Sequence, residues 1–121
     1  MTTATTKAIA ADIARELRAN PKAWTQGTFG RDANGIECHI MEACSWCLIG
    51  HIDKRVRVLD EQGEPVWEIE EVAEKAFRAA AGIASISHFN DAPERSVSDI
   101  IAMCEKVAGI GDVPGFSCGP G

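Results

Sequence analysis

Apolar residues recur every three to four positions along several stretches of the chain, and this spacing is typical of helices that bury one face. In the first stretch Ile9, Ile13 and Leu17 repeat every fourth residue, while charged side chains occupy the other faces. A threonine before it can cap its start, and Asn20-Pro21 is a stop signal because proline cannot continue a helix. The pattern predicts a helix over residues 5–20.

Two similar stretches lie in the second half of the chain. One predicts a helix over residues 69–81, and the other predicts a final helix over residues 96–108. Ser96 and Asp99 form a serine-x-x-acid start signal for the final helix, because each side chain can accept a backbone N–H of the first turn. The residues expected to face inward are Val72, Ala73, Ala76, Phe77, Ala80, Val97, Ile100, Ile101, Cys104 and Val107.

A less regular apolar stripe predicts another helix over residues 40–52. The stripe contains Cys44, Cys47 and His51 at three-to-four spacing. Gly50 lies near the predicted C-terminal end, where a glycine either stops a helix or lets another element pack closely against it.

Two segments lack the helical period. Residues 32–35 read Asp-Ala-Asn-Gly, a turn sequence, so short strands around residues 28–31 and 36–38 are expected to form a small hairpin. At the start of residues 55–67 two valines alternate with two arginines, and a turn sequence with glycine and proline follows. A second small hairpin is expected there.

The predicted fold class is mainly α (α+β), with about four helices packed around one core and one or two small β-hairpins. A length of 121 residues is typical of a single domain. Residues 1–112 are expected to form a single compact helical domain. Residues 113–121 are expected to be a flexible tail, because their glycines and prolines can bury little surface.

Composition indicates a cytoplasmic protein. No apolar run approaches the roughly 20 residues that span a bilayer, and the N-terminus lacks the apolar stretch of a signal peptide. The five cysteines are an odd number, without the density of a disulfide-stapled secreted protein. They are therefore expected to be thiols, and no membrane partner is expected.

The formal net charge of −6 argues against generic nucleic-acid binding, which depends on clustered lysines and arginines. Acidic side chains are concentrated in one stretch: Asp60, Glu61, Glu64, Glu68, Glu70, Glu71 and Glu74. The stretch could face a partner protein with a basic surface. The simpler interpretation is the solvated side of a helix and the loop before it.

The strongest candidate for metal chemistry is the set Cys38, Cys44, Cys47 and His51, since zinc binds cysteine and histidine in tetrahedral groups. On a helix over residues 40–52 the last three would share one face. That face is also the apolar stripe, and free cysteine packs as a small hydrophobe. Core packing is therefore preferred, a structural zinc domain is the alternative, and no cofactor or metal is expected.

The pair Cys44 and Cys47 also has the Cys-x-x-Cys spacing of thioredoxin-like redox proteins. That chemistry needs a cysteine at a helix N-terminus, where the helix dipole lowers the pKa of the thiol. The predicted helix places the pair in its middle, so the redox interpretation is disfavoured.

The candidate binding residues are Trp24, Gln26, Phe89, Asn90 and Asp91, which lie in two polar segments that each contain an aromatic ring. Loop chemistry offers a structural explanation, because Asn and Asp side chains accept backbone N–H groups in turns and caps. Asp91 is expected to have this structural role. The role of Asn90 is left open, since it could be either a turn residue or a ligand contact. Trp24 is expected to anchor the core.

Taken together, these motifs resemble a family of short bacterial and phage proteins, the domain of unknown function DUF6197. The motifs are Trp24-x-Gln26-Gly27 with Phe29, Asp32-x-x-Gly35, Cys47-Leu48-x-Gly50, and Ile86-x-x-Phe89-Asn90-Asp91 followed by a helix that starts at a serine. The resemblance implies a small domain common in phage and mobile-element genomes, with no accepted activity. It also implies that Cys47 belongs to the pattern, whereas Cys38 and Cys44 need not.

The expected function is a non-enzymatic binding or adaptor protein, of phage or mobile-element origin, that contacts a host macromolecule. One alternative is a small-ligand-binding protein or small enzyme with a pocket near Trp24, Phe89, Asn90 and Asp91. The other alternative is the structural zinc domain. No catalytic residue is assigned.

Overall fold

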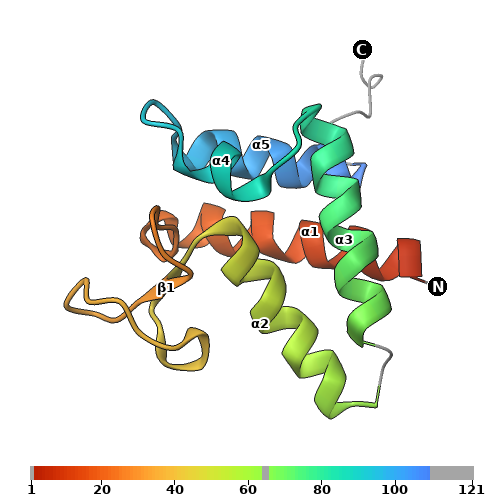
Figure 1. Ribbon diagram of the computed structural model, residues 1–121, viewed down its shortest axis with the longest axis horizontal. Helices are drawn as coiled ribbons and strands as arrows, with labels where there is room; N and C mark the ends of the chain where they lie inside the picture. The colour runs from red at the N-terminus through yellow and green to blue at the C-terminus, as the bar shows by residue number, and fades with distance from the viewer. Residues whose placement is uncertain (1, 64–65, 110–121) are drawn as a thin grey trace.

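The computed structural model describes residues 2–63 and 66–109, which form a mainly helical fold with a small two-stranded antiparallel sheet (Figure 1). The helices are α1 (Thr2–Ala19), α2 (Leu48–Glu61), α3 (Val66–Ala81), α4 (Ile86–Asp91) and α5 (Val97–Ala108). The strands are β1 (Gly30–Arg31) and β2 (Ser45–Trp46), and the single 3-10 turns are η1 (Pro21–Ala23) and η2 (Ile40–Glu42). The predicted tail, 113–121, lies outside the described residues. Among the described helices, none has both the length and the apolarity to cross a membrane.

Helix α1 is the centre of the core. Its Ile13 and Leu17 are completely buried, and the small side chains of Ala10 and Ala14 let neighbouring helices approach closely. Helix α5 packs along α1, and α3 contacts both and contributes the fully buried ring of Phe77 (Figure 1). Each large apolar side chain buried in this way stabilises the fold by about 1.5–3 kcal/mol.

The three most regular sequence patterns are confirmed as helices. Helix α1 begins at Thr2 and ends at Ala19, and α3 begins at Val66, three residues before its predicted start. The start signal of α5 forms a complete capping box: the Ser96 hydroxyl accepts the N–H of Asp99, and the Asp99 carboxylate accepts the N–H of Ser96. These helices follow their sequence signals because periodicity and capping agree.

The predicted helix over residues 40–52 is wrong in its first half. Only residues 40–42 make a 3-10 turn, the chain then extends into β2, and α2 begins at Leu48. The extended part pairs with β1: Gly30 lies opposite Trp46, and the N–H of Cys44 donates to the carbonyl oxygen of Arg31 at 2.8 Å. Cys44 therefore lies before the helix, and its predicted place on the helical stripe is also wrong.

The predicted hairpin over residues 28–38 is correct only in part. The turn forms as expected, with Gly35 at a positive φ of 80° and the Asp32 carboxylate accepting the N–H groups of Asn34 and Ile36. The second arm contributes a single bridge, between Arg31 and Glu37, whereas β2 is the regular partner of β1.

The second predicted hairpin, over residues 55–67, is wrong. Helix α2 continues to Glu61, and α3 has already begun at Val66. Val56 and Val58 alternate in the sequence, but in the helix Val56 is buried and Val58 is exposed. A two-residue alternation therefore also fits a helix that has a single buried position in that turn.

An ion-pair cluster joins α2 to α1. The Arg55 side chain, only 12% exposed, donates to Asp12 at 2.7 Å and to Glu16 at 2.6 Å. Burial alone would raise the pKa of Asp12, but hydrogen bonds and positive charge from Arg15 and Arg55 lower it overall. For Glu16 burial likewise opposes the shift, and hydrogen bonds from Arg55 and Lys54 lower the pKa.

His51 is fully buried beside this cluster. Its Nε2 lies 2.9 Å from the carbonyl oxygen of Ala23 and must donate, because a carbonyl only accepts. Its Nδ1 therefore carries the lone pair and accepts from Arg55 at 3.3 Å. Burial, and then the charges of Lys54 and Arg55, lower the pKa of His51 to about 4, so the ring is neutral at physiological pH.

We expect the free energy of unfolding to fall by about 2 kcal/mol when the pH is lowered from 7 to 5, because of the titration of His51 alone. The folded pKa of about 4 lies below the ordinary value of 6.5, so the unfolded chain takes up a proton in this range and the folded chain does not. The stabilisation is complete above the unfolded pKa and is lost as the pH falls toward 4. Urea unfolding at both pH values measures it.

A matched pair of variants isolates this effect. His51→Gln lowers stability but removes most of the pH dependence between pH 7 and pH 5. His88→Gln, at an exposed histidine, retains the pH dependence of the parent. The carboxyls of Asp12 and Glu16 act below this window, because their pKa values are lowered from 3.8 and 4.5. An unchanged pH dependence in His51→Gln would contradict the assignment.

Candidate functional site

A buried asparagine holds three separate segments together. Asn90, at the end of α4 and only 1% exposed, uses its Oδ1 to accept the indole N–H of Trp24 at 2.6 Å and the backbone N–H of Leu48 at 3.0 Å. Its Nδ2 donates to the carbonyl oxygen of Thr25 at 3.0 Å and to the carboxylate of Asp91 at 2.9 Å. The side chain thus links α4 to the 24–27 loop and to the start of α2.

Two neighbouring side chains complete this connection. The Gln26 amide donates to the carbonyl oxygens of Asn90 and Ala92, both at 2.9 Å. The exposed Asp91 carboxylate accepts the N–H of Gly27 at 3.0 Å. The loop after η1 and the end of α4 are therefore cross-linked in both directions by polar side chains.

Helix α2 begins inside this site. Cys47 is its N-cap residue, and the Cys47 sulfur accepts the N–H of Gly50 at 3.4 Å. A Cβ placed on Gly50 would lie 2.3 Å from the carbonyl oxygen of Phe29. Glycine is therefore required where the loop backbone crosses the first turn of α2. Of the two predicted roles of Gly50, close packing is confirmed, and the role of helix stop is wrong.

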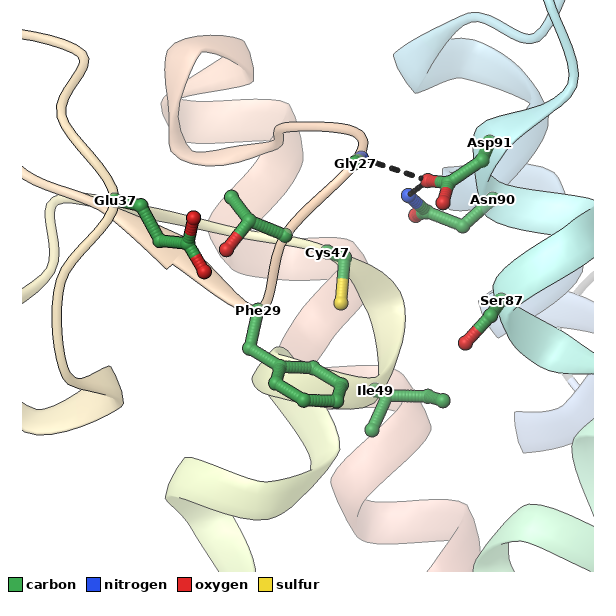
Figure 2. A pocket seen from close by; sticks show the side chains of 9 residues that line it. Gly27, Phe29, Glu37, Cys47, Ile49, Ser87, Asn90 and Asp91 are labelled. Atoms are coloured by element: carbon green, nitrogen blue, oxygen red, sulfur yellow. Dashed lines mark hydrogen bonds between the residues drawn. The ribbon is translucent and has the colours of Figure 1, made fainter.

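Between these elements lies a cleft of about 240 Å³. Figure 2 shows Glu37 on one side, Ser87 and Asp91 on the other, and the Cys47 sulfur and the Phe29 ring between them. The lining residues are Gly27, Thr28, Phe29, Glu37, Cys47, Ile49, Ser87, Asn90 and Asp91.

The polar groups of the cleft differ in how well they are satisfied. Asn90 has a partner for both ends of its amide, and one Asp91 oxygen has two donors. The hydroxyls of Thr28 and Ser87 and the carboxylate of Glu37, in contrast, have no hydrogen-bond or ion-pair partner among residues 2–63 and 66–109. These three groups and the second oxygen of Asp91 are the ones available to a ligand.

Four of the five sequence-predicted binding residues are brought together, and one is not. Trp24, Gln26, Asn90 and Asp91 are joined by the hydrogen bonds given above. Phe89 lies apart from the cleft: its half-buried ring packs on the core and stacks under Arg95, whose Cζ is 3.9 Å from the ring centroid. Trp24 also packs against the core, as expected of an anchor.

Sequence reasoning missed most of the cleft lining. Ile49, Ser87 and Glu37 carry no motif by themselves. The loop interpretation of the segment around Phe89, Asn90 and Asp91 is wrong for residues 86–91, which form α4. Ser85 could have indicated α4, because its hydroxyl caps this helix by accepting the N–H of His88 at 3.2 Å.

The structure does not gather the proposed zinc ligands. Among the described residues, no group of three or more histidine, cysteine, aspartate or glutamate side chains is placed to hold a metal ion. Both ring nitrogens of His51 are occupied, and Cys44 lies on the loop before α2. The core-packing interpretation holds for His51 and Cys47, which are buried, and is wrong for Cys44, which is exposed.

The Cys47 thiol lies at a helix N-terminus, so its expected mid-helix position is wrong. Burial nevertheless raises the pKa of the thiol, and the negative charge of Asp91 raises it further. The N–H groups of Gly50 and Ile49 act in the opposite direction but do not reverse the shift. A protonated thiol is a poor nucleophile.

We expect Asp91→Ala to lower the free energy of unfolding by about 1 kcal/mol, as the loss of a cap-like acceptor usually does. The substitution leaves the N–H of Gly27 and one Asn90 N–H without their acceptor. Asp91→Asn keeps an acceptor oxygen and should stay close to the parent. Glu94→Ala, at an exposed acidic position, is the control for loss of charge. Equal stability of Asp91→Ala and the parent in urea unfolding would show that Asp91 has no structural role.

The cysteines should differ in their rates of alkylation. At pH 7.5 iodoacetamide should modify the exposed Cys44 roughly ten times faster than Cys47, which is 6% exposed and has a raised thiol pKa, since the thiolate is the reactive form. Cys104 should react only after unfolding, because burial raises the pKa of its thiol to about 12. Peptide mapping by mass spectrometry measures the rates, and labelling in urea is the control. Equal native rates for Cys44 and Cys47 would contradict the buried N-cap.

Comparison with known proteins gives one match. The model of a family described as a family of unknown function, DUF6197, matches residues 1–110. Neither the curated proteins nor the solved structures contain a match to the chain. The motifs around Trp24, Cys47 and Asn90 that resemble this family are those that the structure joins at the cleft. The chain belongs to the DUF6197 family of proteins of unknown function.

Proposed function

We propose that this protein is a binding protein, and that the cleft beside Asn90 and Asp91 receives a side chain of a partner protein. The observation that supports this is a set of groups with no partner in the described part of the chain: the Thr28 and Ser87 hydroxyls and the Glu37 carboxylate line one cleft. Polar groups that converge on a concave surface with an apolar floor are typical of ligand sites.

The size of the cleft favours a side chain over a cofactor. Its volume of about 240 Å³ lies below the roughly 300–1,000 Å³ of most small-molecule sites. A single inserted side chain fits this volume and can anchor a larger contact area around it. The floor, formed by Phe29, Ile49 and Cys47, would supply apolar contact.

The acidic character of the chain supports a partner with a basic surface. The net charge is −6, and two of the residues that line the cleft are carboxylates, Glu37 and Asp91. Opposite charges on two surfaces speed their encounter and help to select the correct partner. The same proposal includes an adaptor role toward a host protein in the cytoplasm and an origin in phage or mobile elements.

Selection from a random peptide library tests the proposal. Peptides selected on the parent protein should lose at least about tenfold in affinity for Ser87→Trp, whose indole would fill the cleft. Ser98→Trp is the matched control, because Ser98 is exposed on α5 and does not line the cleft. Peptides that bind the parent and Ser87→Trp equally would place the binding surface elsewhere and contradict the proposal. Thermal unfolding of both variants shows that the fold is retained.

A further inference from the structure

We propose that the group received by the cleft is a guanidinium, so that the partner protein is anchored by an arginine side chain. This inference rests on the proposed function and specifies its ligand. It is carried by the placement of two carboxylates, Glu37 and Asp91, on opposite sides of a cleft whose floor includes an aromatic ring (Figure 2).

The negative charge of the cleft favours a cationic ligand. None of the residues that line the cleft is cationic, and neither Glu37 nor Asp91 forms an ion pair with any described residue. Arg31, in β1, is already occupied: its guanidinium donates to Thr25, Gln26 and Gly35. The negative charge of the cleft is therefore not compensated from within the described part of the chain.

The aromatic floor of the cleft suits a planar cation. The Phe29 side chain is 55% exposed and lines the cleft beside Ile49, so a flat cation can lie on it. Arginine stacks on aromatic rings because the guanidinium is planar and weakly hydrated. The same contact already occurs inside this fold, where Arg95 lies over the ring of Phe89 at 3.9 Å.

The distribution of acceptors separates arginine from lysine. The Ser87 hydroxyl and the second oxygen of Asp91 lie on one side, and the Glu37 carboxylate lies on the other (Figure 2). A guanidinium has a planar fork of donors that can reach acceptors on two sides at once. An ammonium group is a compact point charge, so it cannot satisfy both sides while lying on the ring.

Three capped amino acids test the inference directly. N-acetyl-arginine methylamide, its lysine counterpart and its citrulline counterpart are titrated into the full chain, and backbone amide shifts are followed by NMR. Citrulline has nearly the shape of arginine but no charge. We expect arginine to shift the amides of Gly27, Ile49 and Ser87 and to bind at least about tenfold tighter than citrulline. Lysine should bind more weakly than arginine, and added salt should weaken arginine binding.

Two variants locate the binding. Glu37→Gln and Asp91→Asn each should reduce arginine affinity at least about fivefold. Glu42→Gln is the matched control, because this exposed carboxylate does not line the cleft. Its arginine affinity should equal that of the parent. The melting temperatures of all three variants are compared with that of the parent, so that a loss of affinity is not confused with a loss of fold.

Citrulline or lysine binding as tightly as arginine would overturn the inference, and so would unchanged arginine affinity in both variants. If the peptides selected on the parent require the open cleft but contain no essential arginine, the inference fails and the proposed function stands. If the selected peptides do not require the open cleft, the proposed function itself fails.

Discussion

The amide of Asn90 is the interaction on which the candidate site depends. A buried amide must have partners at both ends, because leaving either end unpaired costs about 1–3 kcal/mol. Here one end accepts from the indole of Trp24 and the backbone of Leu48, and the other donates to the carbonyl of Thr25. These partners belong to the 24–27 loop and to the start of α2, whereas Asn90 itself lies on α4, so one side chain links three segments. The asparagine therefore fixes the walls of the cleft in a way that a hydrophobic residue could not.

A second polar centre, around Arg55 and His51, has a different character. There every charge is met inside the fold: Arg55 by Asp12 and Glu16, and the imidazole by a carbonyl and by Arg55 itself. Such a closed network orients α2 against α1 and leaves little for a ligand to add. The cleft beside Asp91 has the opposite property, since its hydroxyls and the Glu37 carboxylate have no internal partner among the described residues. This contrast distinguishes the proposed binding surface from a structural network of the same fold.

The long helices could be predicted because periodicity, capping and stop signals agree, as in α1 and at Ser96 of α5. The region from residue 40 to residue 67 could not, for two physical reasons. The apolar spacing of residues 40–52 fits a helix, but the extended segment before Cys47 is held by pairing with β1, a contact that no local pattern reveals. Residues 55–58 alternate like a strand, but continuity with the cap at Cys47 keeps them helical. The grouping of Trp24, Gln26, Asn90 and Asp91 could be anticipated only as a set of polar segments, and the inward role of Asn90 required the fold.

The hydrogen bonds of Asn90 also determine when the cleft can exist during synthesis. They join residues 42 and 66 positions apart, so the loop and the first turn of α2 emerge from the ribosome well before their partner. Closing such long loops costs conformational entropy, and this cost is offset only when the native contacts have formed. A nascent chain that stops short of α4 therefore has both the aromatic floor and the Glu37 wall but no opposing wall. The cleft can therefore form only once α4 has been synthesised, so the proposed binding activity would not exist in a shorter nascent chain.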